Sequence, residues 1–160
     1  MGHYIANLRD IEFCLFDLLE REEILGKSIY KDLDRETSMG MLEEVKRMAE
    51  NDLAASFVDG DQQGVKFDPA TGDAKLPESF KKSYKTFMDN EWWRIDAPVE
   101  LGGTSIPPSI RWAIAEMVLG SNPSIHIYAS GTAFAHVAYT SGTEEQKKIA
   151  KLMVDKQWGA

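Results

Sequence analysis

The sequence of 160 residues has a single cysteine and an excess of acidic over basic side chains. Cys14 has no second cysteine for an internal disulfide and no secretory signal precedes it, which indicates a reducing, cytoplasmic compartment. The net charge of −8 argues against nucleic-acid and anionic-membrane partners, whose phosphates would be repelled. The most apolar stretch also contains too many Ser, Thr, Gly, Asn and His residues for a membrane span of about 20 apolar residues.

The common motifs of self-contained active sites are missing as well. H-E-x-x-H, C-x-x-C, G-x-S-x-G and a glycine-rich dinucleotide turn do not occur. His126 and His136 would lie about 15 Å apart on one expected helix, too far to share a metal ion. Residues 59–64 resemble the start of a calcium loop, but position 5 is Gln63 and position 12 is Ala70, so we predict a solvated turn.

The remaining pattern predicts one helical domain. Its clearest amphipathic helix runs from an N-cap at Asp34 to about residue 58, and further helices are expected over 7–19, from Pro77, from Pro107 or Pro108, and from Thr143. The apolar stripe of the helix that begins at Asp34 comprises Leu42, Val45, Ala49, Leu53 and Phe57. Two short segments, 65–67 and 74–76, flank a turn-rich stretch and predict one hairpin. The fold class is therefore an all-α helical bundle with one small β-hairpin excursion.

Local signals give the helix ends and the expected environment of the single cysteine. The sequence T-E-E-Q from Thr143 is a capping box, and Gly142 before it suits a left-handed C-cap. Gly102 and Gly103 predict a tight turn, because the lysine of a phosphate-binding loop does not follow them. We expect Cys14 to pack as a small buried hydrophobe in the helix over 7–19.

No Asp, Glu, Lys or Arg occurs between Glu116 and Glu144. This stretch predicts a helix that ends at residue 119, a break over 120–123 and a second helix over 124–140. In the break, Gly120 suits a left-handed conformation, Asn122 a cap and Pro123 the first helical turn. Apolar or small residues cover nearly the whole circumference of the second helix, so we expect it, with Phe134, to be buried on most sides.

The last seventy residues resemble the N-terminal helical domain of the acyl-CoA dehydrogenases. The resemblance rests on W-W-R-I-D-A-P-V-E-L-G-G (92–103), A-E-M (115–117), Y-T-S-G-T-E-E-Q-K-K (139–148) and W-G-A (158–160). The opening, residues 3–17, resembles a longer branch with an extra N-terminal segment, which includes bacterial fatty-acyl and 3-methylmercaptopropionyl-CoA dehydrogenases. This implies an N-terminal extension with a short helix (1–34) and a helical domain (35–160).

The resemblance implies FAD-dependent α,β-dehydrogenation of an acyl-CoA thioester, as in fatty-acid β-oxidation, with electrons passed to an electron-transfer flavoprotein. In that family the catalytic glutamate lies in the C-terminal domain, and the middle and C-terminal domains hold the flavin. The sequence stops before those domains, so we expect a fragment of a larger enzyme that carries no catalytic residue and binds no FAD alone. The implied partners are the missing domains and further copies in a homo-oligomer.

The resemblance also places acyl-tunnel residues on the helix after Gly120. The lining positions are Ile125, His126, Ala129, Ser130 and Ala133. They fall at i, i+1, i+4, i+5 and i+8, which is one helical face. The small residues among them leave room for an acyl chain, but they equally allow close contact between two helices.

A second hypothesis needs no catalysis. A helical domain separated from its neighbours exposes a large apolar patch, which favours association. The chain would then be a stand-alone helical scaffold or self-association module.

Overall fold

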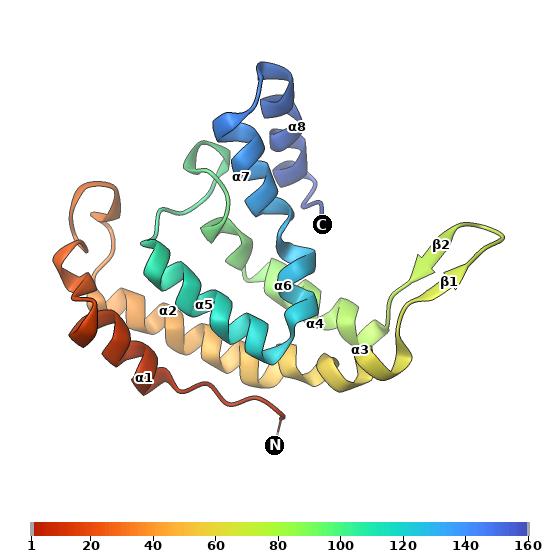
Figure 1. Cartoon of the computed structure of the whole chain (residues 1–160), viewed down its shortest axis with the longest axis horizontal. Coiled ribbons are helices and arrows are strands. Elements are labelled where there is room, and N and C mark those ends of the chain that lie inside the picture. The colour runs from red at the N-terminus through yellow and green to blue at the C-terminus, as the bar shows by residue number, and fades with distance from the viewer. Residues whose placement is uncertain (1, 160) are drawn as a thin grey trace.

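The computed structural model describes residues 2–159 and confirms the all-α fold with one small hairpin (Figure 1). The α-helices are α1 (Leu8–Glu12), α2 (Arg35–Met48), α3 (Phe57–Gln63), α4 (Glu78–Asp89), α5 (Pro108–Ser121), α6 (Pro123–Ala129), α7 (Gly131–Ser141) and α8 (Glu144–Asp155). Wider π turns form η1 (Phe13–Leu18) and η4 (Ala49–Leu53). Tighter 3-10 turns form η2 (Arg21–Glu23), η3 (Ser28–Tyr30), η5 (Ala54–Ser56), η6 (Trp92–Ile95) and η7 (Val99–Leu101).

A long rod built from α2, η4, η5 and α3 forms the base of the molecule (Figure 1). The Asp34 carboxylate accepts the Thr37 N–H at 2.7 Å, which confirms the predicted N-cap. Four residues of the predicted apolar stripe are fully buried: Leu42, Val45, Ala49 and Leu53. Phe57, the fifth, is 37% exposed and stacks on the His3 ring at a centroid distance of 4.5 Å. The break in helical geometry at η4 and η5 changes the direction in which Phe57 points.

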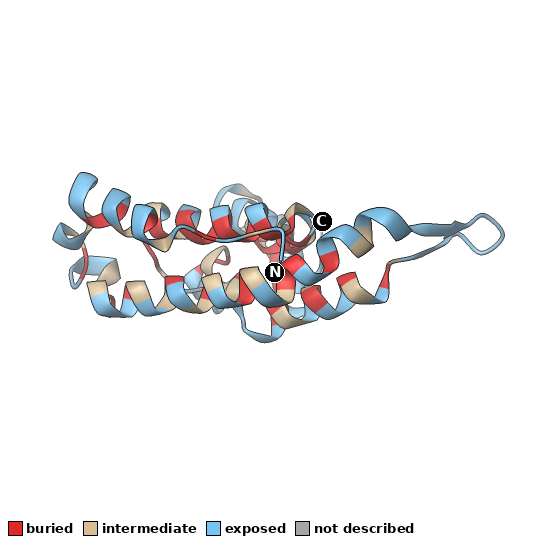
Figure 2. Ribbon diagram, turned by 90° about the horizontal axis from the view of Figure 1, so that it is seen from below, coloured by how far each residue is buried: buried red, intermediate tan, exposed pale blue. Residues whose placement is uncertain are grey.

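Helices α4 and α5 pack on this rod and enclose one hydrophobic core. The N-terminal segment contributes Ile11, Leu15, Phe16, Leu25 and Leu33 to the same buried cluster as the later helices. Residues 2–34 therefore fold onto the common core and have no separate one. Figure 2, seen from below, shows the buried residues within the helical body and exposed residues along the projecting hairpin.

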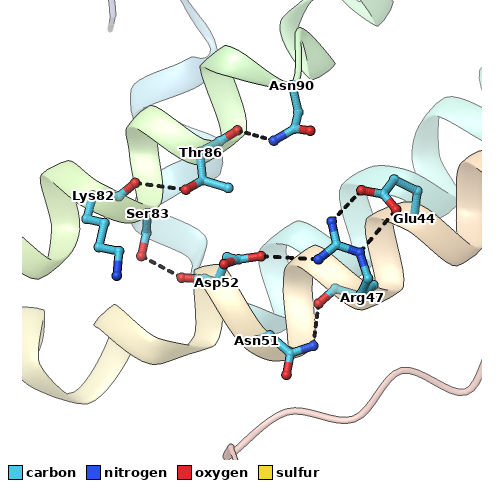
Figure 3. Close-up of polar contacts among 8 residues, drawn as sticks. All are labelled: Glu44, Arg47, Asn51, Asp52, Lys82, Ser83, Thr86 and Asn90. Atoms are coloured by element: carbon cyan, nitrogen blue, oxygen red, sulfur yellow. Dashed lines mark hydrogen bonds and ion pairs between the residues drawn. The ribbon is translucent and has the colours of Figure 1, made fainter.

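Polar contacts hold α4 across the π turn of the rod (Figure 3). The buried Ser83 hydroxyl on α4 donates to the Asp52 carbonyl in η4 at 2.7 Å. On the outer side, Arg47 pairs with Glu44 at 2.5 Å and with Asp52 at 3.9 Å. Exposed ion pairs contribute little to stability, and those of Arg47 lie within the rod, so the Ser83 hydroxyl is the polar contact of this group that joins α4 to the rod.

The break in the uncharged stretch forms where it was predicted, but Gly120 has a different role in it from the one expected. Asn122 accepts the Ser124 N–H at 3.2 Å and Pro123 occupies the first turn of α6, both as predicted. Gly120 is not left-handed, because α5 continues to Ser121. A Cβ at Gly120 would overlap the Tyr4 ring, so the close approach of the N-terminal segment is what requires glycine there.

The predicted single helix over 124–140 is wrong. It divides at Ser130 into α6 and α7, and the Ser130 hydroxyl donates to the Ile127 carbonyl at 2.6 Å. A Cβ at Gly131 would overlap the Trp158 carbonyl, so the backbone of Trp158 passes directly against this junction.

The expected burial of this stretch on most sides is also wrong. Ile127, Phe134 and Val137 are 59–62% exposed. The reason is that α7 and α8 form an antiparallel hairpin that stands away from the body (Figure 1). Helix α7 therefore packs mainly against α8, and much of the rest of its surface is open.

The capping box at the start of α8 is confirmed in both directions. The Thr143 N–H donates to Gln146 Oε1 at 2.8 Å, and the Gln146 N–H donates to Thr143 Oγ1 at 3.3 Å. The predicted left-handed cap at Gly142 is wrong, since its φ is −87°. Glycine is needed because a Cβ there would overlap the Ala138 carbonyl.

Cys14 is exposed, contrary to the prediction. The segment after α1 is the π turn η1, which carries more residues per turn than the 3.6 period assumed for the helix over 7–19. The apolar stripe consequently shifts, and Phe13 and Leu18 also face outward while Leu15 and Phe16 are buried.

The hairpin pairs β1 (Lys66–Asp68) with β2 (Asp73–Lys75), as predicted. The solvated turn predicted over 59–64 is wrong for residues 59–63, because they belong to α3, which ends at the left-handed Gly64. Within residues 2–159, no three His, Cys, Asp or Glu side chains are grouped to hold a metal ion. No helix in the same range has the length and apolar character needed to cross a bilayer.

Candidate functional site

The cleft of greatest interest lies between α7, η3 and the connection from η6 to α5, and its volume is about 440 Å³. Its lining is mostly apolar with several polar groups. Apolar residues come from all three segments, and the polar side chains include those of Asp96, Arg111 and His136. The main apolar lining residues are Ile29, Tyr30, Ile95, Pro98, Ile106 and Val137.

The wall opposite α7 is an irregular segment that is held in shape by Arg94. The Arg94 carbonyl accepts the Thr104 N–H at 2.9 Å, and its guanidinium donates to the Gly102 carbonyl at 2.7 Å. Gly102 has a φ of +85°, and the Gly103 N–H donates to the Pro98 carbonyl at 2.9 Å. The predicted tight turn at these two glycines is confirmed, and it brings together Pro98 and Thr104, both of which line the cleft.

A part-buried ion pair forms the inner end of the cleft. The Arg111 guanidinium on α5 donates to the Asp96 carboxylate, and both residues line the cleft and a narrow gap of about 10 Å³ behind it. His126 on α6 borders that gap and is half-buried. Burial lowers the pKa of His126, the Arg111 charge lowers it further, and the Asp96 charge opposes both.

The structure separates the five residues that were predicted to form one wall. Ala133 lines the cleft from α7, and His126 borders the gap behind the Asp96–Arg111 pair. Ile125 and Ala129 are buried in the core beneath α6, and Ser130 is half-buried at the junction of the two helices. The end of α6 at Ala129 is the reason, because α7 leaves the junction in a new direction.

Most of the cleft residues were not found from the sequence. Tyr30, Arg111 and Val137 come from segments far apart in the chain, and no local spacing connects them. The sequence did indicate the wall opposite α7. Residues 95–103 lack a helical or strand pattern and contain Pro98, Gly102 and Gly103, which predicts an irregular connection.

The lowered pKa of His126 predicts a specific dependence of stability on pH. The imidazole titrates near its ordinary pKa of 6.5 in the unfolded chain and at a lower pKa in the folded chain. Between these two values the unfolded chain binds more protons, so stability decreases as the pH falls through this window and is retained above it.

We expect the urea midpoint of the parent chain to fall more steeply from about pH 7 to about pH 5 than that of His126→Asn. Other groups titrate in both proteins, so the difference between the two curves isolates His126. Parallel curves would show that the burial of this imidazole has no energetic consequence.

Comparison with known proteins gives relatives along the whole chain, although no family model matches it. The chain is 43% identical over 160 residues to the broad-specificity linear acyl-CoA dehydrogenase FadE5 of Mycobacterium tuberculosis, and covers 26% of that protein. It is 28% identical over 121 residues to the 3-methylmercaptopropionyl-CoA dehydrogenase of Ruegeria pomeroyi, 20% of which is covered. The chain thus spans about a quarter or less of the curated relatives it matches. This homology over its full length identifies the chain as a member of the acyl-CoA dehydrogenase family that corresponds to one part of such an enzyme.

Proposed function

We propose that the chain is the N-terminal helical domain of an FAD-dependent acyl-CoA dehydrogenase and forms part of its acyl-chain pocket. The observation that carries the proposal is the 43% identity to an acyl-CoA dehydrogenase along all 160 residues. Within this domain we assign residues 1–34 to an N-terminal extension and 35–160 to the helical domain proper. The homology does not favour the alternative of a stand-alone scaffold or self-association module.

The cleft between α7 and the connection before α5 supports a role in the pocket wall. It is bounded largely by apolar side chains, as a binding site for an acyl chain requires. Val137 in the lining of the cleft and Phe134 on the same helix are 62% and 60% exposed. Large apolar side chains that stay this exposed indicate a surface that another part of a protein covers. We propose that the middle and C-terminal domains of the enzyme cover this surface and close the cleft.

The five predicted lining residues take different parts in this proposal. Ala133 contacts the acyl chain directly from α7, where its small side chain leaves the cleft open. Ile125 and Ala129 form the layer beneath, which keeps α6 in place. His126 contributes a neutral imidazole behind the Asp96–Arg111 pair, and Ser130 ends α6 at the point where the wall turns.

The proposal assigns FAD to the other domains of the enzyme. Arg111 is paired with Asp96, so the arginine that lines the cleft is not free to bind the cofactor's pyrophosphate. The complete enzyme would pass electrons to an electron-transfer flavoprotein, act in cytoplasmic fatty-acid β-oxidation and assemble as a homo-oligomer.

A chimera tests the proposal directly. The matching 160 residues of the mycobacterial enzyme are replaced by this chain, and flavin content and acyl-CoA dehydrogenation are measured over a series of acyl lengths. We expect the chimera to retain flavin and turnover. A folded chimera that lacks turnover would contradict the proposal.

Within the chimera, Ala133→Leu tests the wall. Added volume in the cleft should lower kcat/KM for the longest acyl chains by about tenfold relative to the shortest. The matched control is Ala55→Leu at an exposed position on η5, away from the cleft. Equal length profiles for both variants would place the acyl chain elsewhere.

A further inference from the structure

The β-hairpin carries an arrangement of charges that does not suit its own pairing. The register places Lys66 opposite Lys75 and Asp68 opposite Asp73. Like charges directly opposite each other destabilise a strand pair, and an isolated two-stranded hairpin is at best marginally stable in water. The hairpin therefore gains little from its internal charge pairs.

The outer edge of β1 has free backbone groups and apolar side chains. The hairpin projects from the helical body, and all six of its strand residues are exposed (Figures 1 and 2). The Asp68 carbonyl accepts the Gly72 N–H at 2.8 Å within the turn. Because the backbone groups of successive strand residues point to opposite sides, the Phe67 N–H and C=O face the outer edge. The Phe67 side chain is 65% exposed and that of Val65 is 56% exposed.

We propose that β1 pairs in antiparallel fashion with β1 of a second copy of this chain. The two copies are related by a two-fold axis that passes midway between their Phe67 residues. Antiparallel pairing of K-F-D with itself places each Lys66 opposite the Asp68 of the other copy. The two Phe67 residues then lie opposite each other, exchange backbone hydrogen bonds and bring their rings into contact. The same charges that repel within the hairpin thus attract between copies.

The occupant is a second copy because the strand is complementary to itself. Such an isologous contact uses one patch twice and closes after two subunits. The edge strand β2, D-A-K, has the same charge symmetry but carries Ala74 at its centre. The methyl group of Ala74 offers far less apolar contact than the Phe67 ring, so β1 is the edge that pairs.

Two charge variants test the register. In Lys66→Asp, residue 66 faces Asp68 of the other copy with like charge, although it now attracts Lys75 within the hairpin. In Asp68→Lys, residue 68 faces Lys66 of the other copy with like charge. We expect each variant alone to dimerise about tenfold more weakly than the parent, as measured by sedimentation.

An equimolar mixture of the two variants is the decisive sample. Each interface then pairs two acidic with two basic side chains, so dimerisation should return to the parent level. Association through the apolar α7 surface is common to all samples and does not alter this comparison. A mixture that associates no better than its components would overturn the proposal.

A pair of cysteine variants locates the axis and keeps the Phe67 ring. Residues 66 and 68 of two copies face each other as a non-hydrogen-bonded pair with Cα atoms about 4.5 Å apart, within the range that a disulfide spans. With Cys14 replaced by serine, an equimolar mixture of Lys66→Cys and Asp68→Cys should form a cross-linked dimer under mild oxidation. The matched control on β2 is the mixture of Asp73→Cys and Lys75→Cys in the same background. Equal or greater cross-linking of the control would overturn the assignment to β1.

Discussion

Replacing Ile125 with alanine is expected to lower the free energy of unfolding by about 2–5 kcal/mol. The side chain is fully buried beneath α6, within the core cluster that the rod and α5 share. Removal of its outer methyl groups leaves a cavity that the surrounding helices fill only partly. Urea denaturation of the isolated chain measures the loss.

Phe134→Ala is the matched control, since it removes a larger side chain from the same uncharged stretch. Its ring is 60% exposed on α7, so the expected loss is about 0.5 kcal/mol or less. A loss at Phe134 as large as that at Ile125 would mean that α7 packs against the body as the sequence had suggested. In the complete enzyme we expect Phe134→Ala to cost more, because the other domains would cover it.

Gly103→Ala is expected to destabilise the chain by about 1–3 kcal/mol and to deform the wall of the cleft. A Cβ at this position would overlap the Ala97 carbonyl, which is backbone and cannot rotate away. The neighbouring hydrogen bond from the Gly103 N–H to the Pro98 carbonyl would have to break or lengthen. Thermal unfolding reports the loss of stability.

Gly40→Ala serves as the control for that substitution. Gly40 lies inside α2, and a Cβ there would meet nothing within 4 Å. Alanine favours the helix over glycine, so this variant should be more stable by about 1 kcal/mol. If Gly103→Ala were equally stabilising, the tight turn would not constrain the cleft.

Structural features that depend on contacts between residues close together in the chain were predicted correctly from the sequence. Asp34, Asn122 and Thr143 each begin a helix because a side-chain oxygen accepts a backbone N–H two or three residues later. The existence of the hairpin follows equally from a turn-rich stretch between two short strand segments. None of these features depends on distant parts of the chain.

Two glycines, Gly120 and Gly142, show where prediction from neighbouring residues in the sequence fails. Gly120 and Gly142 both follow apolar helical segments and were assigned left-handed caps. Neither has a positive φ; instead, Tyr4 approaches one and the Ala138 carbonyl the other. Glycine is required at both positions because a Cβ would overlap these neighbouring atoms, and the sequence around each glycine does not reveal that overlap. The exposed Cys14 is a similar case, because the π turn that turns it outward interrupts the helical period.

The candidate site was predictable only in outline. Ala133 and His126 were named from the family resemblance, and the structure places them at the cleft and at the gap behind it. Arg111 and Tyr30, which complete the same region, have no sequence pattern in common. Their meeting depends on how η3, α5 and α7 pack, and a single sequence does not encode that packing in any local signal.

The sequence by itself determined the helical class, the main helix starts, the small hairpin and the family resemblance, since each depends on spacing or side-chain chemistry within short stretches. The tertiary structure alone decided which apolar surfaces are buried. Residues 124–140 are uncharged throughout, yet Ile125 is buried while Phe134 is largely exposed, because α6 lies against the core and α7 stands away from it. Burial is a property of the neighbours that surround a side chain, and hydrophobicity along the chain does not specify them.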